Sequence, residues 1–238
     1  MRLTIIGYGK MGREIEKTAL EKGHEVILRI DRDNTHDFDS EIFQKSDVAL
    51  EFSTPETALA NIISCLNRGI PVVSGTTGWT EKLPEVKKLA QQKGSSFLYA
   101  SNFSIGVNIM FNMNKRLAAI MDQLPSYSVN MEEIHHTMKK DAPSGTAISL
   151  ADDIIHECGR YDAWTPDKVA GEASIGISSL REGQVPGTHR VVWESDADII
   201  TLEHKAKSRK GFALGAIIAA DFIHKRKGVF TMSDLLGF

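Results

Sequence analysis

The segment from Glu133 to Ala147 holds the richest set of reactive side chains in the chain. It carries two adjacent histidines, His135 and His136, then Lys139, and then Ser144-Gly145-Thr146 at the start of an amphipathic stretch. A histidine can deliver a proton near neutral pH. A helix that begins at this point offers free N–H groups and hydroxyls to an anion, and the lysine adds positive charge to that seat. The combination suits an anionic substrate that accepts a hydride and then a proton.

A plainer interpretation of the same segment is a capped helix that follows a solvated basic loop, and the segment by itself favours it. Successive residues of a strand point to opposite faces, so His135 and His136 are expected to have different roles unless the strand bends. Neither histidine has the cysteine or histidine spacing of a zinc site, and we expect no metal. A catalytic role becomes the better interpretation only beside a dinucleotide-binding fold.

A second basic run extends from His204 to Lys210. Its Arg209 can hold a carboxylate with two parallel hydrogen bonds, and so could complete a site for a doubly charged anion. A solvated strand end explains the lysines of this run equally well. His189 and His204 lie on expected strands, and the sequence leaves their roles open.

A dinucleotide-binding fold is indicated near the N-terminus by Gly7-Tyr8-Gly9-Lys10-Met11-Gly12, which has the form G-x-G-x-x-G. A short apolar run precedes this glycine loop, and an amphipathic stretch follows it. Gly7 permits the tight turn, Gly9 lets the backbone approach a pyrophosphate, and Gly12 lets the helix pack closely. The N–H groups at the start of the helix then face the phosphates. The sequence therefore predicts that NADH or NADPH binds here.

Asp31 follows Gly12 by 19 residues, at the end of the second expected strand, where a carboxylate takes the ribose hydroxyls of NAD. Arg32 could instead meet the 2′-phosphate of NADP. A glycine turn with a surface Asp–Arg pair is the plainer alternative. Two later strand ends could face the nicotinamide ribose, although each alone is also a common polar turn. The residues at these two ends are Gly75, Thr76 and Thr77, and Ala100, Ser101, Asn102 and Phe103.

The elements that must position these residues alternate between strand and helix over the first hundred residues. Short β-branched or aromatic runs, bounded by Gly, Pro or Asp, predict buried parallel strands. These runs are Leu3–Ile6, Val26–Ile30, Val48–Phe52, Val72–Ser74 and Phe97–Ala100. Amphipathic stretches predict helices at Met11–Lys22, Pro55–Arg68 and Pro84–Lys93. The alternation predicts an α/β fold with a Rossmann-type doubly wound parallel sheet.

The pattern changes after about residue 104. Helices are expected at Gly106–Met121, Gly145–His156 and Phe212–Lys225, strands at Ser128–His136, His189–Ser195 and Ile199–His204, and irregular structure at Trp164–Pro186. Two neighbouring strands without a helix between them imply a second, α+β domain built on a mixed sheet. We expect residues 1–106 and 210–238 to form the dinucleotide-binding domain and residues 107–209 to form the substrate-binding domain.

The composition excludes several classes of protein. Of the 238 residues, 42% are hydrophobic and 25% are charged, which rules out a disordered chain, a collagen and a coiled coil. The formal net charge of −3 gives no basic excess for nucleic acid, and two cysteines cannot form a disulfide framework. No apolar stretch is long enough to cross a bilayer, and the first residues leave no room for a signal peptide. We therefore expect a cytoplasmic protein with a small-molecule substrate and neither nucleic-acid nor membrane partners.

The run from Glu133 to Ala147 resembles the signature of the 4-hydroxy-tetrahydrodipicolinate reductase (dihydrodipicolinate reductase) family. The resemblance covers nearly the whole chain and includes the glycine loop, Gly75–Gly78, Asn102–Asn108 and the basic run around Arg209. It implies an oxidoreductase of bacterial lysine and diaminopimelate synthesis that uses NADH or NADPH. The implied substrate is the cyclic dicarboxylate (2S,4S)-4-hydroxy-2,3,4,5-tetrahydrodipicolinate, which is reduced with loss of water. The resemblance also implies a homotetramer joined through the sheets of the second domain.

The same resemblance implies roles for individual residues. His135 matches the proton donor or acceptor, and Lys139 matches a second proton-handling or charge-stabilising group. His136, Gly145 and Thr146 match residues that bind the substrate carboxylates, and Ser144 and Arg209 complete the expected substrate site. The implied cofactor contacts are Gly7 to Gly12, Asp31, Arg32, Gly75 to Thr77 and Ala100 to Phe103.

The chain departs from the family pattern in three places. Its glycine loop is one residue shorter than the common family form, G-x-x-G-x-M-G. Thr137 and Met138 stand where relatives often carry Arg, Pro or His, and the segment around residues 32–45 is trimmed. We expect these departures to affect the choice of cofactor most.

Two other functions fit part of the sequence. Another NAD(P)-dependent dehydrogenase acting on a small dicarboxylate would share the first hundred residues but not the run Asp141 to Thr146. A non-catalytic NAD(H) sensor would need the glycine loop and Asp31, but it would have no use for His135 or Lys139.

Overall fold

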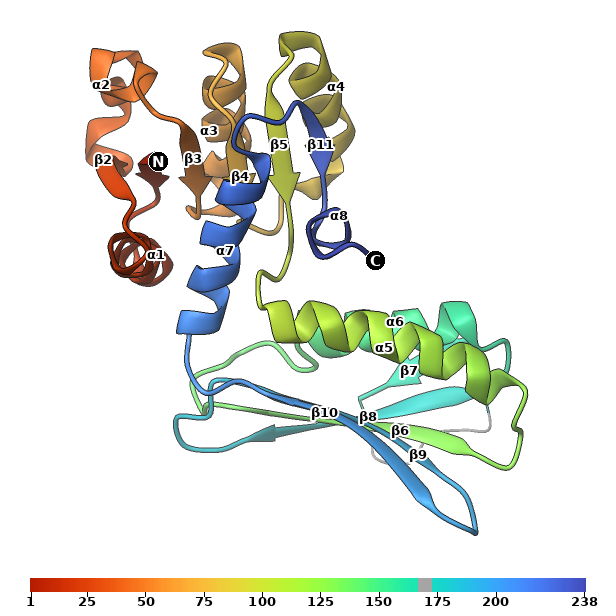
Figure 1. Cartoon of the computed structure of the whole chain (residues 1–238). Coiled ribbons are helices and arrows are strands. Elements are labelled where there is room, and N and C mark those ends of the chain that lie inside the picture. The colour runs from red at the N-terminus through yellow and green to blue at the C-terminus, as the bar shows by residue number, and fades with distance from the viewer. Residues whose placement is uncertain (167–172) are drawn as a thin grey trace. The chain divides into compact units, whose positions relative to one another are not determined.

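The computed structural model describes residues 1–166 and 173–238. The chain folds into two compact units, and each is described by itself. Residues 1–105 and 209–238 form the first unit, and residues 106–208 form the second. The C-terminal segment, blue in Figure 1, therefore returns to the N-terminal half of the chain.

The first unit is built on a parallel sheet of six strands in the order β11-β5-β4-β3-β1-β2. The strands are β1 (Arg2–Ile6), β2 (Glu25–Ile30), β3 (Val48–Glu51), β4 (Val72–Ser74), β5 (Ser96–Tyr99) and β11 (Gly228–Phe230). The predicted doubly wound parallel sheet is confirmed, and the first five strands lie where they were predicted. Strand β11 was not predicted, because three residues after a basic turn carry little periodic signal.

Helices cover both faces of this sheet. They are α1 (Lys10–Glu21), α3 (Pro55–Asn67), α4 (Leu83–Lys93), α7 (Lys210–Ile223) and α8 (Met232–Leu236), with the short elements η1 (Arg32–Asp39), α2 (Glu41–Gln44) and η2 (Thr80–Lys82). The predicted helices are present, whereas α8, η1, α2 and η2 were not predicted. All four are three to eight residues long, too short to show a hydrophobic period.

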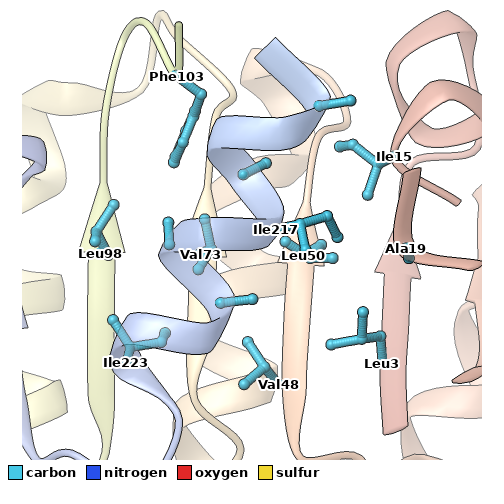
Figure 2. Packing of buried hydrophobic residues seen from close by; sticks show 14 of the residues in the cluster. Leu3, Ile15, Ala19, Val48, Leu50, Val73, Leu98, Phe103, Ile217 and Ile223 are labelled. Carbon is cyan, nitrogen blue, oxygen red and sulfur yellow. The ribbon is translucent and has the colours of Figure 1, made fainter. Parts of the chain in front are cut away.

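Helix α7 anchors the C-terminal segment to the first sheet. Figure 2 shows its Ile217 and Ile223 packed toward Leu50 and Val73 in a cluster of buried apolar side chains. Helix α7 packs closely against the backbone at Phe103 because it carries Gly215. An added Cβ at Gly215 would lie 1.7 Å from the carbonyl oxygen of Phe103. Removal of this apolar surface from water stabilises the association of the two chain segments.

The second unit holds a mixed sheet of five strands in the order β10-β9-β6-β8-β7. Its strands are β6 (Ser128–His135), β7 (Ala163–Thr165), β8 (Ser174–Arg181), β9 (Thr188–Glu194) and β10 (Ile199–Lys205), and its helices are α5 (Ile105–Asp122) and α6 (Gly145–Glu157). Strand β6 pairs parallel with β8 and antiparallel with β9. The predicted α+β unit with a mixed sheet is therefore confirmed.

The prediction of irregular structure at Trp164–Pro186 is wrong for most of the described part of that stretch. Strands β7 and β8 occupy it, and residues 167–172 of the same prediction lie outside the described residues. Strand β8 reads SIGISSLR, whose serines and glycine give a weak strand signal. Its Ile175 and Ile177 are nevertheless fully buried, and pairing with both β6 and β7 stabilises the strand.

Among the described residues, none of the helices is both long and apolar enough to cross a membrane.

Candidate active site

The glycine loop has a backbone that only some residues could adopt. Gly7 has φ +88°, and a Cβ there would lie 2.3 Å from the carbonyl oxygen of Phe52. A Cβ at Gly12 would lie 2.3 Å from the carbonyl oxygen of Gly7, so helix α1 packs directly against the turn. By contrast, nothing lies within 4 Å of a Cβ at Gly9, at the exposed start of α1. The loop therefore leaves open space where a pyrophosphate would approach the helix N-terminus.

A cavity of about 330 Å³ opens at the carboxyl ends of β1, β2 and β3. Ligands of open parallel sheets bind at such ends. The cavity brings together five of the predicted cofactor residues, namely Gly7, Tyr8, Gly9, Asp31 and Arg32. It also brings in residues that were not predicted: Thr35, Phe52, Ser53, Thr54, Thr57 and Asn61. The position of Ser53 and Thr54, just after the third parallel strand, is the sequence signal that could have identified them.

Asp31 and Arg32 lie on the exposed rim of this cavity. The Asp31 carboxylate accepts the backbone N–H of Tyr8 at 3.3 Å and that of Arg32 at 2.9 Å, and it caps the start of η1. The Arg32 guanidinium forms no ion pair with any of the described residues, which leaves its charge available to an anion. Open space at the glycine loop, an acid beside it and an unpaired arginine together fit a nicotinamide dinucleotide.

The other predicted cofactor residues do not line the cavity, and some of them support its wall. Thr76 accepts the backbone N–H of Ser53 at 2.9 Å and donates to the buried Glu51 at 3.1 Å. A Cβ at Gly75 would lie 2.1 Å from the ring of Phe52, which lines the cavity. Contacts of the remaining residues with a bound cofactor stay predictions; these are Lys10, Met11, Gly12, Thr77, Ala100, Ser101, Asn102 and Phe103.

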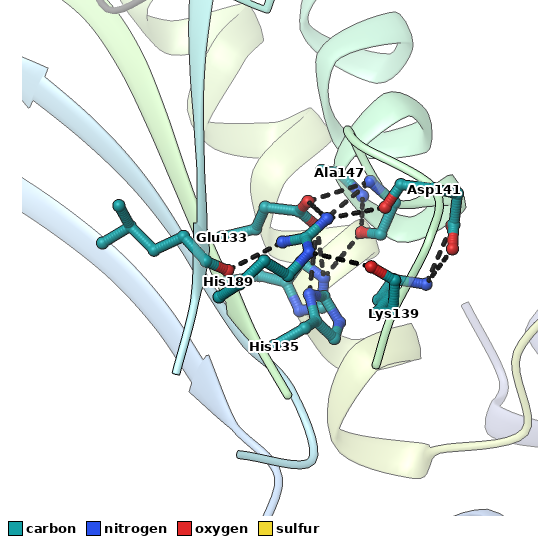
Figure 3. Close-up of polar contacts among 9 residues, drawn as sticks. Glu133, His135, Lys139, Asp141, Ala147 and His189 are labelled. Carbon is teal, nitrogen blue, oxygen red and sulfur yellow. Dashed lines mark hydrogen bonds and ion pairs between the residues drawn. The ribbon is translucent and has the colours of Figure 1, made fainter. Parts of the chain in front are cut away.

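In the second unit, the strand end before the His–Lys loop forms a buried cluster around Glu133 (Figure 3). Nδ1 of His135 lies 3.3 Å from Oε2 of Glu133, an ion-pair distance, although the two atoms do not form a hydrogen bond. Nε2 of His189 lies 3.9 Å from the same oxygen and 3.2 Å from Oγ of Ser144. The rings of His135 and His189 meet edge to face, with centroids 5.1 Å apart. A titratable cluster thus surrounds the predicted proton donor.

Glu133 stays charged inside this cluster. Burial by itself raises the pKa of its carboxyl, but the neighbouring His135 and the hydrogen bonds from Ser144 outweigh burial and hold the pKa well below the usual 4.5. The backbone N–H of Ser144 donates to both carboxylate oxygens at 3.1 Å, and Nη2 of Arg181 lies 3.2 Å from Oε1. An ionised, partnered carboxylate therefore stands next to His135.

His189 is neutral at physiological pH, since burial and then the neighbouring charge on His135 lower its pKa to about 4. The ligand atoms of Glu133, His135 and His189 lie within 4.8 Å of one another, which is a spacing that could hold a metal ion. Arg181 already supplies a fixed positive charge to that carboxylate, and its presence opposes a cation there.

Lys139 lies in the loop after β6 and is paired, not free. Its Nζ donates to the two carboxylate oxygens of Asp141 at 2.9 and 2.8 Å. The backbone of this loop is held by Arg181, whose guanidinium donates to the carbonyl oxygens of Lys139 at 3.3 Å and Asp141 at 2.6 Å. The backbone of Lys139 is therefore held in place, and its side chain is half-buried. Asp141 competes with any substrate anion for the positive charge of Lys139.

The start of helix α6 differs in one respect from the predicted anion seat. Ser144 caps the helix through its hydroxyl, which accepts the N–H of Ala147 at 3.2 Å, as its sequence position suggested. The backbone N–H of Ser144, however, is already used by Glu133. Gly145 is exposed with open space around it, so the seat for an anion is reduced to the backbone at Gly145 and Thr146.

The remaining predicted substrate residues are placed separately. Strand β6 ends at His135, and His136 is half-buried in the turn that follows, where its carbonyl accepts the N–H of Lys139 at 3.0 Å. His135 is buried and His136 is half-buried, and the expected difference in their roles stays a prediction. Arg209 is an exposed residue directly before α7 in the first unit, and its role in substrate binding stays a prediction.

Comparison with known proteins decides the family. The family model for the N-terminus of dihydrodipicolinate reductase matches residues 1–103, and the model for the C-terminus of the same enzyme matches residues 106–236. The chain belongs to the dihydrodipicolinate reductase family. The resemblance found in the sequence is thereby confirmed, together with the NAD(P)H-dependent reductase class that it implies.

Individual relatives within the dihydrodipicolinate reductase family span the whole chain. The 4-hydroxy-tetrahydrodipicolinate reductase of Christiangramia forsetii is 46% identical over 238 residues, covering 99% of this chain and 98% of that protein. The enzyme of the same name from Caldanaerobacter subterraneus subsp. tengcongensis is 34% identical over 253 residues, with the same coverage. The dipicolinate-bound dihydrodipicolinate reductase from Paenisporosarcina sp. TG-14 matches in structure with a TM-score of 0.80, at 26% identity and 97% coverage of both chains.

Three residues of this candidate site were missed or left open by sequence reasoning. Glu133 could have been found, because it is two residues before His135 and so shares its face of the strand. Arg181 could not, since its place beside Glu133 depends on the parallel pairing of β6 with β8. His189 was left open, and the pairing of β9 with β6 brings it to the cluster.

Proposed function

We propose that this chain reduces (2S,4S)-4-hydroxy-2,3,4,5-tetrahydrodipicolinate to tetrahydrodipicolinate with NADH or NADPH, in the synthesis of lysine and diaminopimelate. In this reaction the substrate takes up one hydride and one proton and loses its 4-hydroxyl as water. The observation that carries the proposal is the cluster of Glu133, His135 and Lys139 at the end of β6, in a chain that belongs to this family throughout its length.

The proton and charge chemistry falls to residues of the second unit. Reduction of the ring leaves an electron-rich enamine, which His135 protonates. Lys139 releases Asp141, which is exposed, and offsets the negative charge that develops on the substrate. The substrate carboxylates are held by His136, Gly145 and Thr146, and the role of Arg209, which belongs to the first unit, stays a prediction.

The cofactor is held by residues of the first unit. Bound NADH or NADPH supplies the hydride. The glycine loop receives the pyrophosphate, the Asp31 carboxylate accepts hydrogen bonds from the ribose hydroxyls, and the Arg32 guanidinium pairs with a 2′-phosphate where one is present. Both nucleotides are therefore expected to serve.

We also propose a homotetramer that works in the cytoplasm. Strand β10 is the outer strand of the second sheet, and its Ile199 and Ile200 are 58% and 39% exposed. An open sheet edge with exposed apolar residues is a site for pairing with another chain. The two cysteines, Cys65 and Cys158, are both free and buried, which suits a reducing compartment.

The proposed activity is tested by following nicotinamide absorbance with the purified chain. We expect NADH and NADPH to be oxidised when the hydroxy-tetrahydrodipicolinate is added and to remain reduced without it. Tight nucleotide binding without turnover would overturn the proposal and favour a nucleotide sensor. Turnover with an open-chain dicarboxylate instead would favour a different dehydrogenase.

A further inference from the structure

We infer that Glu133 is a positioning residue for the reaction, with a buried carboxylate that holds the imidazole of His135 for proton delivery and fixes the start of helix α6. This inference rests on the proposed function, because it takes His135 as the proton donor. It adds a residue of the buried strand interior to a site otherwise built from the loop and the helix end.

The carboxylate of Glu133 lies beside one of the two ring nitrogens of His135. Glu133 is fully buried, and its Oε2 lies 3.3 Å from Nδ1 of His135, a ring nitrogen that is itself buried. Among the described residues, no other carboxylate forms an ion pair with His135. A histidine with one nitrogen beside a carboxylate presents the other, Nε2, to its reaction partner. Glu133 thus determines which ring nitrogen serves the substrate.

The other ring nitrogen meets a residue without a side chain. An added Cβ at Gly187 would lie 3.1 Å from Nε2 of His135. Any larger residue there would crowd that nitrogen, whereas glycine leaves it uncovered. The imidazole is therefore bounded by a carboxylate at Nδ1 and by glycine backbone near Nε2.

The same carboxylate connects His135 to the helix that receives the substrate anion. Both of its oxygens accept the backbone N–H of Ser144, the residue that caps α6. Arg181 contacts Oε1 of Glu133 and also the loop backbone at Lys139 and Asp141. One ion pair, Glu133 with Arg181, thus holds the histidine, the helix start and the lysine loop together.

The charge on Glu133 must then influence the proton on His135. The charged and titratable groups around the pair come from each neighbouring element, and they are Arg181 of β8, His189 of β9, His204 of β10, and Lys139 and Asp141 of the loop. A nearby negative charge favours the protonated imidazole and a nearby positive charge disfavours it. A proton donor acts only while it carries its proton, so activity is expected to be lost on the alkaline side.

The first variant is Glu133→Gln, which keeps the size of the side chain and removes its charge. We expect kcat to fall about 100-fold, with KM changed less than about threefold, because orientation matters most in the transition state. We also expect the alkaline limb of the kcat/KM profile to move to lower pH by about one unit, since the protonated ring has lost its anion. A merely structural role would lower the rate equally at every pH.

The second variant, Arg181→Gln, is expected to move the alkaline limb in the opposite direction. It removes the cation that shares Glu133 and leaves the anion to act on His135 alone, so the alkaline limb moves to higher pH. The matched control is Glu132→Gln, which breaks a neighbouring Glu–Arg pair, Glu132 with Arg190 at 2.9 Å, on the other face of β6. We expect that control to keep the wild-type pH profile and kcat.

The outcomes separate the two proposals. Circular dichroism and NADH titration check that each variant is folded, and if Glu133→Gln does not fold, Arg181→Gln and Glu133→Asp are used in its place. Glu133→Asp keeps the charge and should lower kcat while leaving the alkaline limb in place. Limbs that coincide in wild type, Glu133→Gln and Arg181→Gln overturn the inference. A wild-type enzyme without turnover overturns the proposed function instead.

Discussion

Gly187 lies against the imidazole of His135, where a larger residue would crowd the ring. It has φ +152°, and a Cβ there would lie 3.1 Å from Nε2 of His135. We expect Gly187→Ala to lower kcat at least about tenfold, because a small displacement of a catalytic group is costly. Gly183→Ala is the control, since Gly183 also has a positive φ, of +43°, but open space around it. Equal kcat values for the two variants would show that the Gly187 methyl does not affect the ring.

Cofactor choice also belongs to single residues. Asp31→Ala should weaken the binding of NADH more than that of NADPH, because it removes the acceptor for the ribose hydroxyls. Arg32→Ala should do the reverse, because its unpaired guanidinium is the group available to a 2′-phosphate. KM values for both nucleotides with the two variants check this expectation. An Arg32→Ala enzyme with unchanged NADPH kinetics would exclude Arg32 from that role.

At the scale of elements, the sheet of the second unit buries a histidine that must stay neutral. The pKa of His189 in the folded chain is about 4, against a usual 6.5. The unfolded chain therefore takes up a proton that the folded chain refuses, and stability falls as the pH falls from about 6.5 to about 4, by about 3 kcal/mol. Above pH 6.5 this effect is absent.

Urea unfolding at about pH 7 and about pH 4.5 measures that loss. His189→Gln should lose less stability between the two pH values than the wild type does, because an amide takes up no proton. His36→Gln is the control, since the His36 side chain is 81% exposed and should leave the dependence unchanged. The same loss in wild type and His189→Gln would contradict a neutral, buried His189.

The elements also differ in how well the sequence alone predicts them. Apolar runs such as Val72–Ser74 and the capped helix after Ser144 were predictable, because local pattern and tertiary burial agree there. Strand β8 was not, because its serines and glycine form a strand only between two partners. The same holds for the site. His135 and Lys139 could be predicted because they share one short segment, whereas Arg181 joins the site only through the pairing of β6 with β8.

At the scale of the whole molecule, the exposed edge strand β10 predicts assembly. We expect light scattering at micromolar concentration to give about four times the mass of one chain, consistent with an edge that would otherwise stay unpaired. Ile199→Glu should shift the population to smaller species, because it places a charge among apolar edge residues. Leu20→Glu, at a 56% exposed position of helix α1, is the matched control and should not. A wild-type monomer would contradict the proposed tetramer.

The reaction as a whole requires the nucleotide chemistry of one unit and the proton chemistry of the other. Lys139→Ala should lower kcat by about 10²–10⁴-fold, because it removes charge stabilisation that increases as the substrate is reduced. If the lysine only held a carboxylate equally in the ground state and transition state, KM would rise and kcat would be spared. Nucleotide binding should survive this change, since the glycine loop belongs to the first unit.

The most direct test is the kcat of His135→Ala, measured beside His136→Ala with the hydroxy-tetrahydrodipicolinate and an NADH titration. We expect His135→Ala to lose about 10²–10⁴-fold in kcat with a smaller change in KM, because its proton is needed after binding. His136→Ala should mainly raise KM, and both variants should bind NADH as the wild type does. A His135→Ala enzyme with near-full kcat would contradict the role of His135 as proton donor, even in a chain of this family.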